Sequence, residues 1–466
     1  MGNLRAKDLS RIGYTNDVAR SLVINTISKH FKHHSKEVLI QIFTQLIQKP
    51  EQYATDETLG KIAGLFIEQV PEVKHQSFSL LEETGVLKVY GAKVVTPDTR
   101  RQMEVAMSLP VAIQGALMPD AHIGYGLPIG GVLATDNAVI PYAVGVDIGC
   151  RMALTITDAP ATCLKSQRFQ LKKALEEYTH FGMDGGLDFY QEHPVLDHVL
   201  FRETELLRKL HPKAVRQIGT SGGGNHFVEF GIAELEDEQI FGLPGGCYLA
   251  LLSHSGSRGL GANIARHFTA IAINTCKLPK HAQPLAWLDL RSDAGAEYWE
   301  SMNLAGDYAR ACHERIHANV LKAAGLKALK TIDNHHNFAW KEKLADGKEV
   351  IVHRKGATPA HNGELGIIPG SMTAPAFIVS GKGEELSLFS ASHGAGRMMS
   401  RRQAKESMTV SAMKKRLAAE NVTLIGGSVE ENPDAYKDIR QVMSAQESLV
   451  EVIGRFYPKI VRMHKE

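Results

Sequence analysis

The 466-residue chain is 44% hydrophobic with a formal net charge of only +2, which excludes a disordered or strongly basic protein and allows one large or two ordinary domains. No run approaches the ~18–20 uninterrupted apolar residues of a membrane helix, and the polar opening MGNLRAKDLSRIG lacks a signal-peptide apolar region, so we expect a cytoplasmic protein with no membrane contact. Five cysteines without CxxC spacing exclude a disulfide framework and a four-cysteine zinc site.

Residues 1–80 are predicted to form a small helical N-terminal extension. Apolar residues from Val38 to Ile47 recur at helical spacing, with Ser35 as the N-cap, and a second helical pattern runs from Asp56 to Gln69. Residues 1–50 carry eight Lys or Arg against three Asp or Glu. This excess is typical either of RNA contact or of a solvated helix face.

From about residue 87 the pattern changes to short β-branched runs broken by glycine, such as VLKVYGAKVV and RMALTITDAP. Helical patterns return over residues 165–210 and 262–326, and residues 353–400 are again glycine-rich with short apolar runs. The sequence therefore predicts an α+β fold, with residues 87–466 forming a single large catalytic domain of mixed sheets and helices.

The last part of the chain has a helical pattern. Asn432 is a suitable N-cap and Pro433 suits the first turn, while one apolar face runs from Ile439 to Val450 and Ile453. We therefore predict a long C-terminal helix.

Five residues are candidate metal ligands. Asp147 and Cys150 lie three residues apart in PYAVGVDIGC, and His226, His254 and His336 occur in polar, glycine-rich segments. A carboxylate can bridge two ions while a thiolate holds one, so these side chains would complete two sites with open positions for catalysis. Ligand softness favours Zn²⁺ or Co²⁺ over Mn²⁺ at the thiolate.

Each candidate also has a simpler structural interpretation, because buried cysteines, turn-forming aspartates and hydrogen-bonded histidines are common. The NHFVE segment that contains His226 argues for function, since an amide, an imidazole and a carboxylate follow a glycine-rich turn. His336 is preferred to its neighbour His335 because it precedes Asn337.

Five glycine-rich segments suggest phosphate binding: GTSGGG, SGSRG, HRKG, PGSM and HGAGR. Glycine lets backbone N–H groups approach an anion, and Arg258, Arg354, Lys355 and Arg397 add positive charge, which predicts a site for several phosphates. In SASHGAGR, small neighbours leave His393 accessible. It is a candidate nucleophile toward phosphorus, with a metal ligand or a turn histidine as alternatives.

Taken together, these segments resemble the RtcB family of RNA ligases, which join an RNA 3′-phosphate or 2′,3′-cyclic phosphate to a 5′-hydroxyl. The matching stretches occur in the family's order and cover roughly residue 87 onward: MPDAHIGYGLPIGG, VGVDIGC, GTSGGGNHFVE, HSGSRGLG, HNFA, HRKGA, IPGSM, SHGAGR and NPDAYKDIRQVM.

The resemblance implies two Mn²⁺ ions and GTP as cosubstrate, and so replaces the preference for zinc. The implied metal ligands are Asp147, Cys150, His226, His254 and His336, with Asp147 or Cys150 available to bridge. His393 would attack the α-phosphate of GTP to form a histidine–GMP intermediate. The guanylyl group would then activate the RNA 3′-phosphate for attack by the 5′-hydroxyl.

The resemblance also assigns nucleotide and RNA contacts. The implied GMP pocket contains Asn225, His226, Phe227, Val228, Glu229, His335, His336, Pro369, Gly370, Ser371, Met372, His393, Gly394, Ala395, Gly396, Tyr436 and Lys465. The implied RNA contacts are Arg258, Arg354, Lys355, Asp120 and His122. Three positions depart from the family pattern. Ala376 replaces the usual hydroxyl residue, Thr373 follows PGSM where a small residue is common, and Lys465 is only the nearest candidate for a C-terminal lysine that reads guanine.

We expect such an enzyme to act in RNA repair or tRNA splicing, and an archease-like activator is a possible partner. One alternative is a metal-dependent RNA end-processing phosphodiesterase that uses the same ions without nucleotidyl transfer. Another is a noncatalytic RNA-binding regulator.

Overall fold

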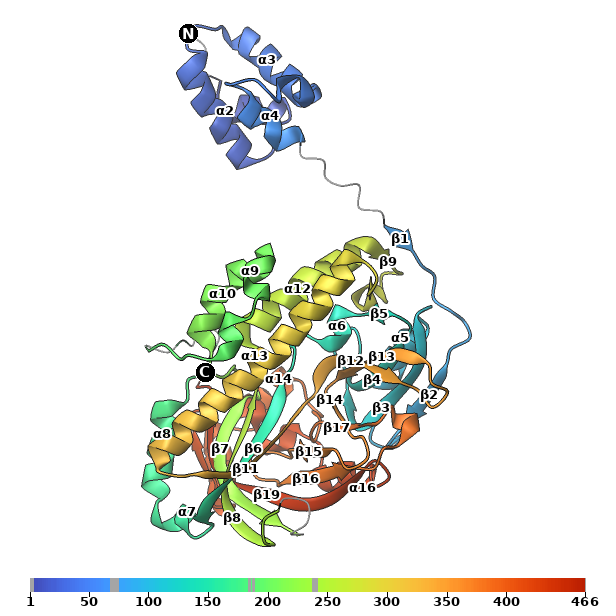
Figure 1. Cartoon of the computed structure of the whole chain (residues 1–466), viewed down its shortest axis with the longest axis vertical. Coiled ribbons are helices and arrows are strands. Elements are labelled where there is room, and N and C mark those ends of the chain that lie inside the picture. The colour runs from blue at the N-terminus through green and yellow to red at the C-terminus, as the bar shows by residue number, and fades with distance from the viewer. Residues whose placement is uncertain (1–3, 68–74, 183–185, 187–188, 237–241, 466) are drawn as a thin grey trace. The chain divides into compact units, whose positions relative to one another are not determined.

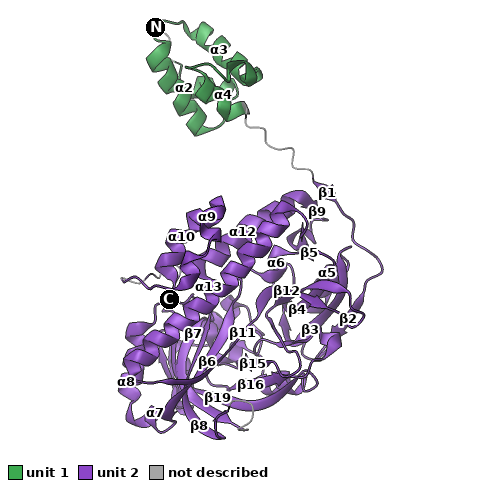
Figure 2. Ribbon diagram, in the orientation of Figure 1, with its two compact units in different colours: residues 1–74 green, residues 75–466 purple. Residues whose placement is uncertain are grey.

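A computed structural model describes residues 4–67, 75–182, 186, 189–236 and 242–465. The chain divides into two compact units, residues 1–74 and 75–466 (Figure 2). Within the described ranges, no helix combines the length and apolar character needed to cross a membrane.

The smaller unit is helical. Its helices are α1 (Ala6–Arg11), α2 (Asp17–His30), α3 (Lys36–Gln48), the 3₁₀ helix η1 (Pro50–Tyr53) and α4 (Gly60–Ile67). The predicted helix after Ser35 is confirmed, because the Ser35 side chain accepts a hydrogen bond from the Val38 N–H and caps α3. Leu39, Phe43 and Leu46 on its apolar face are fully buried in the small core of this unit.

The second predicted helix begins later than its sequence pattern. Asp56 Oδ1 accepts hydrogen bonds from the N–H groups of Thr58 and Leu59, at 2.8 and 2.7 Å, and these bonds form a turn before α4. Gln69, where the pattern ended, lies outside the described residues.

An eight-stranded sheet is the centre of the larger unit (Figure 1). Its strand order is β11-β6-β8-β7-β19-β16-β15, and β18 pairs in parallel with β19. The strands are β6 (Arg151–Pro160), β7 (Phe227–Leu235), β8 (Gly246–Ser255), β11 (Ala328–His335), β15 (Leu365–Ile368), β16 (Ala376–Gly381), β18 (Thr423–Ile425) and β19 (Val450–Met463). Asn334 on β11 hydrogen-bonds the N–H and the carbonyl of Ile367 on β15, at 3.0 and 3.3 Å. The two ends of this strand order therefore meet, and the sheet nearly closes.

The sheet buries both of its faces, as the alternation of side chains along β8 shows. Leu249 and Leu251 pack with helical residues such as Leu171 and Ile316, whereas Ala250 and Leu252 join the core inside the curved sheet. Successive side chains of a strand point to opposite faces, so a nearly continuous apolar run suits this position.

A five-stranded sheet with the order β12-β13-β4-β3-β2 lies beside the first. Its strands are β2 (Val86–Val89), β3 (Ala112–His122), β4 (Ile129–Thr135), β12 (Asn337–Lys343) and β13 (Glu349–Lys355). Three short pairs complete the described strands: β1 (Gln76–Ser77) with β9 (Cys276–Lys277), β5 (Ala138–Val139) with β10 (Leu288–Asp289), and β14 (Ala357–Pro359) with β17 (Ser390–Ser392).

Helices cover the outer side of these sheets, and the 32-residue α13 runs diagonally across the unit in Figure 1. The α-helices are α5 (Pro97–Met107), α6 (Pro141–Val144), α7 (Cys163–Ser166), α8 (Arg168–Tyr178), α9 (Leu200–Glu203), α10 (Glu205–Gln217), α12 (Arg258–Thr275), α13 (Asp293–Ala324), α14 (Arg401–Ser407), α15 (Val410–Ala419) and α16 (Ile439–Ser444). The 3₁₀ helices are η2 (Pro194–Asp197), η3 (Gln283–Leu285), η4 (Glu385–Ser387), η5 (Val429–Glu431) and η6 (Pro433–Ala435). This mixture confirms the predicted α+β class.

The predicted long C-terminal helix is wrong. Asn432 caps only the short η6, and α16 begins after Asp438 and ends at Ser444. Val450 and Ile453 belong to β19, which pairs with both β7 and β16. Pairing on both sides outweighs the helical spacing, and the β-branched and aromatic residues of VEVIGRFYPKIV suit a strand.

Candidate metal centre and active site

Strand pairing brings the five candidate metal ligands to one end of the eight-stranded sheet. Asp147 and Cys150 lie in the turn before β6, and His226 immediately precedes β7. His254 is close to the end of β8, and His336 immediately follows β11. Because β8 is antiparallel to both β6 and β7, its end meets their beginnings, with His254 opposite Met152 and Phe227.

The ligand atoms form two overlapping groups. Cys150 Sγ lies 3.2 Å from His254 Nε2, which lies 3.2 Å from His336 Nε2. Cys150 Sγ also lies 3.4 Å from His226 Nε2, which lies 3.1 Å from Asp147 Oδ2. Within each group of three, all ligand atoms are within 4.8 Å of one another. The sulfur is thus common to both groups, whereas the sequence argument from ligand type gave this role to the carboxylate.

Neighbouring backbone groups orient two of these ligands. His254 Nδ1 lies 3.1 Å from the carbonyl of Asn225, so this nitrogen donates and leaves Nε2 for a metal. The Ser257 N–H donates to Asp147 Oδ1 at 3.1 Å. A Cβ on Gly256 would lie 2.1 Å from the same oxygen, so glycine in the SGSRG segment makes room for this carboxylate.

Burial disfavours charge on three of the ligands, Cys150, His254 and His336. It raises the pKa of the Cys150 thiol well above its ordinary value, with a further contribution from Asp147. It lowers the pKa of His254 to about 3 and that of His336 well below its ordinary value. Nδ1 of His226 and Nδ1 of His336 are also buried without a hydrogen-bond partner.

His393 lies beside this cluster, with its ring centroid 4.9 Å from that of His336. Asp120 Oδ2, at the end of β3, lies 2.7 Å from His393 Nδ1 and also accepts from the N–H groups of His393 and Gly394. Asp120 is fully buried. With the Nδ1–H donated to this carboxylate, the lone pair of a neutral His393 imidazole lies on Nε2.

Backbone contacts fix the distance between His336 and His393. The carbonyl of His336 accepts from the Gly356 N–H at 2.7 Å, and β14, which follows directly, pairs with β17, which precedes His393. Gly356 has φ +60°, and a Cβ there would lie 3.1 Å from His393 Cε1. The glycine of HRKG therefore permits close packing against the His393 ring.

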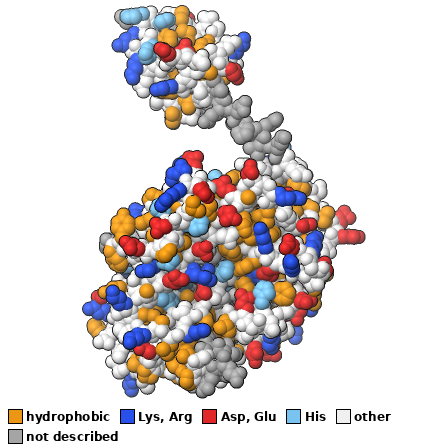
Figure 3. Space-filling view, in the orientation of Figure 1, with side chains coloured by type: hydrophobic (Ala, Val, Ile, Leu, Met, Phe, Trp, Pro, Cys, Tyr) orange, Lys and Arg blue, Asp and Glu red, His pale blue; other side chains and the backbone are white. Residues whose placement is uncertain are grey.

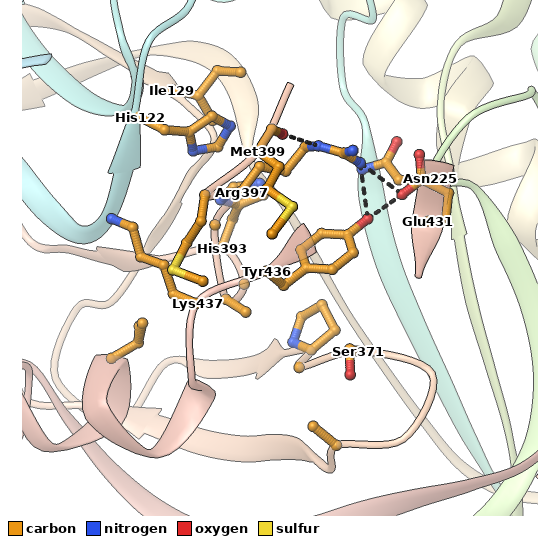
Figure 4. Close-up of a pocket in the computed structure, with 18 of the residues that line it drawn as sticks. His122, Ile129, Asn225, Ser371, His393, Arg397, Met399, Glu431, Tyr436 and Lys437 are labelled. Atoms are coloured by element: carbon orange, nitrogen blue, oxygen red, sulfur yellow. Dashed lines mark hydrogen bonds and ion pairs between the residues drawn. The ribbon is translucent and has the colours of Figure 1, made fainter. Parts of the chain in front are cut away.

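A cavity of about 980 Å³ opens against His393 and His254 (Figure 4). Its lining includes most residues of the sequence-predicted GMP pocket: Asn225, Phe227, Glu229, Pro369, Gly370, Ser371, Met372, His393, Gly394, Ala395, Gly396 and Tyr436. Ala376 and the predicted RNA contact His122 also line it. Burial raises the pKa of Glu229 well above its ordinary value.

Five predicted GMP contacts lie outside the described cavity lining. His226 and His336 belong to the ligand cluster instead. Val228 is fully buried in the core beside α8, and Lys465 is exposed. The His335 ring packs on Phe338 and Trp340, because adjacent residues leave a strand in opposite directions. Neither Val228 nor His335 lines the described cavity, and their nucleotide contacts stay predictions.

The predicted cationic RNA contacts also need correction. Arg354 has no exposed surface, and its guanidinium donates to Glu342 at 2.7 Å and to Ser390 at 2.8 Å. Lys355 is buried and donates to the carbonyls of Tyr125 and Tyr142, and burial lowers its pKa to about 7. Because both side chains are buried and hydrogen-bonded within the protein, neither lies at a surface that RNA could reach.

Arg258 is partly exposed, yet its guanidinium donates to Thr220 at 3.0 Å and to the carbonyl of Gly182. The bond to Thr220 therefore holds the GTSGGG segment in place. Acidic and basic side chains are interspersed over the visible face of the larger unit (Figure 3), so this face offers RNA no broad basic surface.

A charged network in the cavity wall is absent from the sequence predictions. Arg397 donates to Glu431 Oε2 at 2.9 Å, the Tyr436 hydroxyl donates to the same oxygen, and the guanidinium lies over the Tyr436 ring, 5.3 Å from its centroid (Figure 4). Lys437 donates to the carbonyls of Pro119 and Ala121, at 2.9 and 2.8 Å, and so fixes the strand on both sides of Asp120. The sequence signal for it is the charged and aromatic run ENPDAYK, whose spacing also predicts the start of a helix.

Comparison with known proteins identifies the family. A family model described as tRNA-splicing ligase RtcB matches residues 102–207 and 198–464. The chain belongs to the RtcB family. It is 34% identical over 404 residues to the RNA-splicing ligase RtcB of Escherichia coli strain K12, covering 80% of this chain and 96% of that protein. It is 31% identical to the tRNA-splicing ligase RtcB of Nanoarchaeum equitans, covering 77% of this chain and 89% of that protein. This protein is therefore an RNA ligase.

Proposed function

We propose that this RtcB-family enzyme uses GTP and two Mn²⁺ ions to join RNA ends that carry a 3′-phosphate or 2′,3′-cyclic phosphate to 5′-hydroxyl ends. The reaction would proceed through a histidine–GMP intermediate on His393. The observation that most directly supports this proposal is the position of His393. Its ring centroid lies 4.9 Å from that of His336, and Asp120 holds its Nδ1.

The residues present suit two divalent cations. One group offers Cys150, His254 and His336, and the other offers Asp147, His226 and the same sulfur. The raised pKa of Cys150 is that of a buried thiol that lacks a positive partner. Bound Mn²⁺ would neutralise phosphate oxygens and keep the thiol deprotonated.

The chain itself would orient the nucleophile. Asp120 accepts the Nδ1 proton of His393, so that Nε2 can attack the α-phosphorus of GTP as pyrophosphate leaves. The RNA 3′-phosphate oxygen would then take the guanylyl group from Nε2. Attack of the 5′-hydroxyl oxygen on that 3′-phosphorus would release GMP and form the phosphodiester bond. A cyclic phosphate would first have to be opened.

The cavity supplies the nucleotide pocket of this proposal. Pro369 to Met372 and Gly394 to Gly396 line it, and Tyr436 would stack on guanine. Asn225 lines the cavity and also orients His254, so it would link the nucleotide to the metal site. We propose RNA repair or tRNA splicing in the cytoplasm as the setting, with an archease-like activator as a possible partner.

Intact mass and peptide mapping after exposure to GTP and Mn²⁺ test this proposal. We expect a GMP adduct on His393 that is labile in acid and stable in base, and that is lost in His393→Ala. The exposed His281 serves as a matched control, because His281→Ala should keep the adduct. Turnover of cyclic-phosphate ends without GTP and without His393 would instead support the phosphodiesterase alternative.

A further inference from the structure

The loop between β3 and β4 presents two large apolar side chains at the edge of the active-site cavity. Tyr125 is 77% exposed and Ile123 is 54% exposed. Both line the cavity that contains His393. Exposed apolar residues grouped beside a reactive group indicate a binding surface. Single exposed apolar residues elsewhere on a protein are common and indicate nothing about binding.

This loop is held firmly despite its exposure. The Gln102 amide nitrogen donates to the carbonyls of Gly124 and Gly126, at 2.6 and 2.8 Å, and its oxygen accepts from the Gly124 N–H at 3.1 Å. The buried Lys355 ammonium donates to the carbonyl of Tyr125 itself. Because the backbone on both sides of the ring is already fixed, a partner would lose little free energy in ordering it.

The loop is also close to the nucleophile. His122, where β3 ends, lies with its Nδ1 3.1 Å from the carbonyl of Asp120, the residue that holds His393. At its other end, the Ile129 side chain packs against Gly356, which also contacts His393. Figure 4 shows His122 and Ile129 beside each other on one wall of the cavity.

We propose that Tyr125, supported by Ile123, stacks on an unpaired nucleobase next to the RNA end that is being joined. This inference rests on the proposed ligase reaction and adds a substrate contact to it. Aromatic rings bind single-stranded RNA by stacking whatever the base, since every base has a flat face. Stacking would also supply binding free energy that Arg354 and Lys355 do not supply, because both cations are buried.

A comparison of two RNA substrates tests this contact in the full chain. For RNA with unpaired terminal nucleotides, Tyr125→Ala should raise KM about 10- to 100-fold, while Tyr125→Phe should stay within a few-fold of the natural protein. For RNA with abasic terminal nucleotides, KM should already be high in the natural protein and should rise no further in Tyr125→Ala.

Matched variants separate stacking from general damage. Phe169 on α8 is 78% exposed outside the described cavity lining, so Phe169→Ala should leave the KM for RNA unchanged. Ile123→Ala should raise this KM less than Tyr125→Ala. Guanylylation of His393 without RNA should proceed normally in all four variants, which also shows that they fold.

Two results would overturn the contact while the proposed function survives. One is an unchanged KM for unpaired RNA in Tyr125→Ala. The other is an increase in the KM for GTP alone, which would assign the ring to the nucleotide. Failure of the natural protein to form the GMP adduct would instead reject the proposed function. Stacking would then be judged from the affinity of Tyr125→Ala for the two RNAs without ligation.

Discussion

The ligand cluster around Cys150 and the network of Arg397, Glu431 and Tyr436 both bury polar groups beside one cavity, but they differ in charge. In the network, a guanidinium meets a carboxylate at 2.9 Å. In the cluster, a thiol and three imidazoles crowd around one carboxylate, and burial opposes ionisation of both Cys150 and His254. The network is therefore electrostatically complete, whereas the cluster needs cations to become so.

The largest effect should follow removal of the shared sulfur. Cys150→Ala should slow ligation about 1,000-fold or more, in line with the several kcal/mol that a bound metal contributes to a transition state. It should also abolish the fall in Tm that a chelator causes in the natural protein. Single-turnover ligation and thermal unfolding with and without Mn²⁺ measure both effects.

The exposed Cys247 provides the control, since Cys247→Ser should behave like the natural protein in both assays. A chelator-dependent Tm that persists in Cys150→Ala would show that the two groups of ligands do not share this sulfur.

Disrupting the charged network should lower the free energy of unfolding and leave metal dependence unchanged. Glu431→Ala leaves the Arg397 guanidinium in the cavity wall without its carboxylate, and breaking such a buried pair costs about 3 kcal/mol of unfolding free energy. Denaturant unfolding measures this loss, and added Mn²⁺ should not restore it. For comparison, Glu406 pairs with Arg402 on the surface, so Glu406→Ala should cost less than about 1 kcal/mol. Equal costs would remove the distinction between the two pairs.

Lys355 provides an intermediate case, a buried cation whose described hydrogen-bond partners are carbonyl groups. Burial lowers its pKa to about 7, so above that pH the unfolded chain, with a lysine pKa near ~10.4, binds one more proton than the folded chain. The unfolding free energy should therefore rise with pH, by roughly 1 kcal/mol between pH 7 and pH 8 from this group.

Urea unfolding at several pH values should show this rise in the natural protein and its loss in Lys355→Met. The exposed Lys414 gives the control, because Lys414→Met should keep the slope. The same slope in Lys355→Met would mean that another group causes it.

The identity of the site residues could be predicted from the sequence better than their burial and their contacts. Motif spacing led to the five ligands and to His393, because Asp, Cys and His in glycine-rich turns have little use in packing. The pairing that joins them could not be read, since long stretches of chain separate β6 from β7 and β8 from β11, and the register depends on the whole sheet.

The errors have the same origin. Arg354 was interpreted as a surface cation, yet it belongs to an interior strand and pairs with Glu342 from the neighbouring β12. The apolar run VIV at residues 350–352 is a usable sign of burial. Val450 and Ile453 fitted a helical face equally well as a strand, and only the partners β7 and β16 decide between the two.

The position of β19 has a consequence for how this protein acquires activity. It is the last strand along the chain, yet it lies between β7 and β16 in the middle of the sheet order. During synthesis, β7 would leave the ribosome more than two hundred residues before its neighbour, and pairing across such a separation is slow. The catalytic end of the sheet therefore cannot be completed before β19 has been synthesised, and until then the unpaired edges of β7 and β16 are open to chaperones.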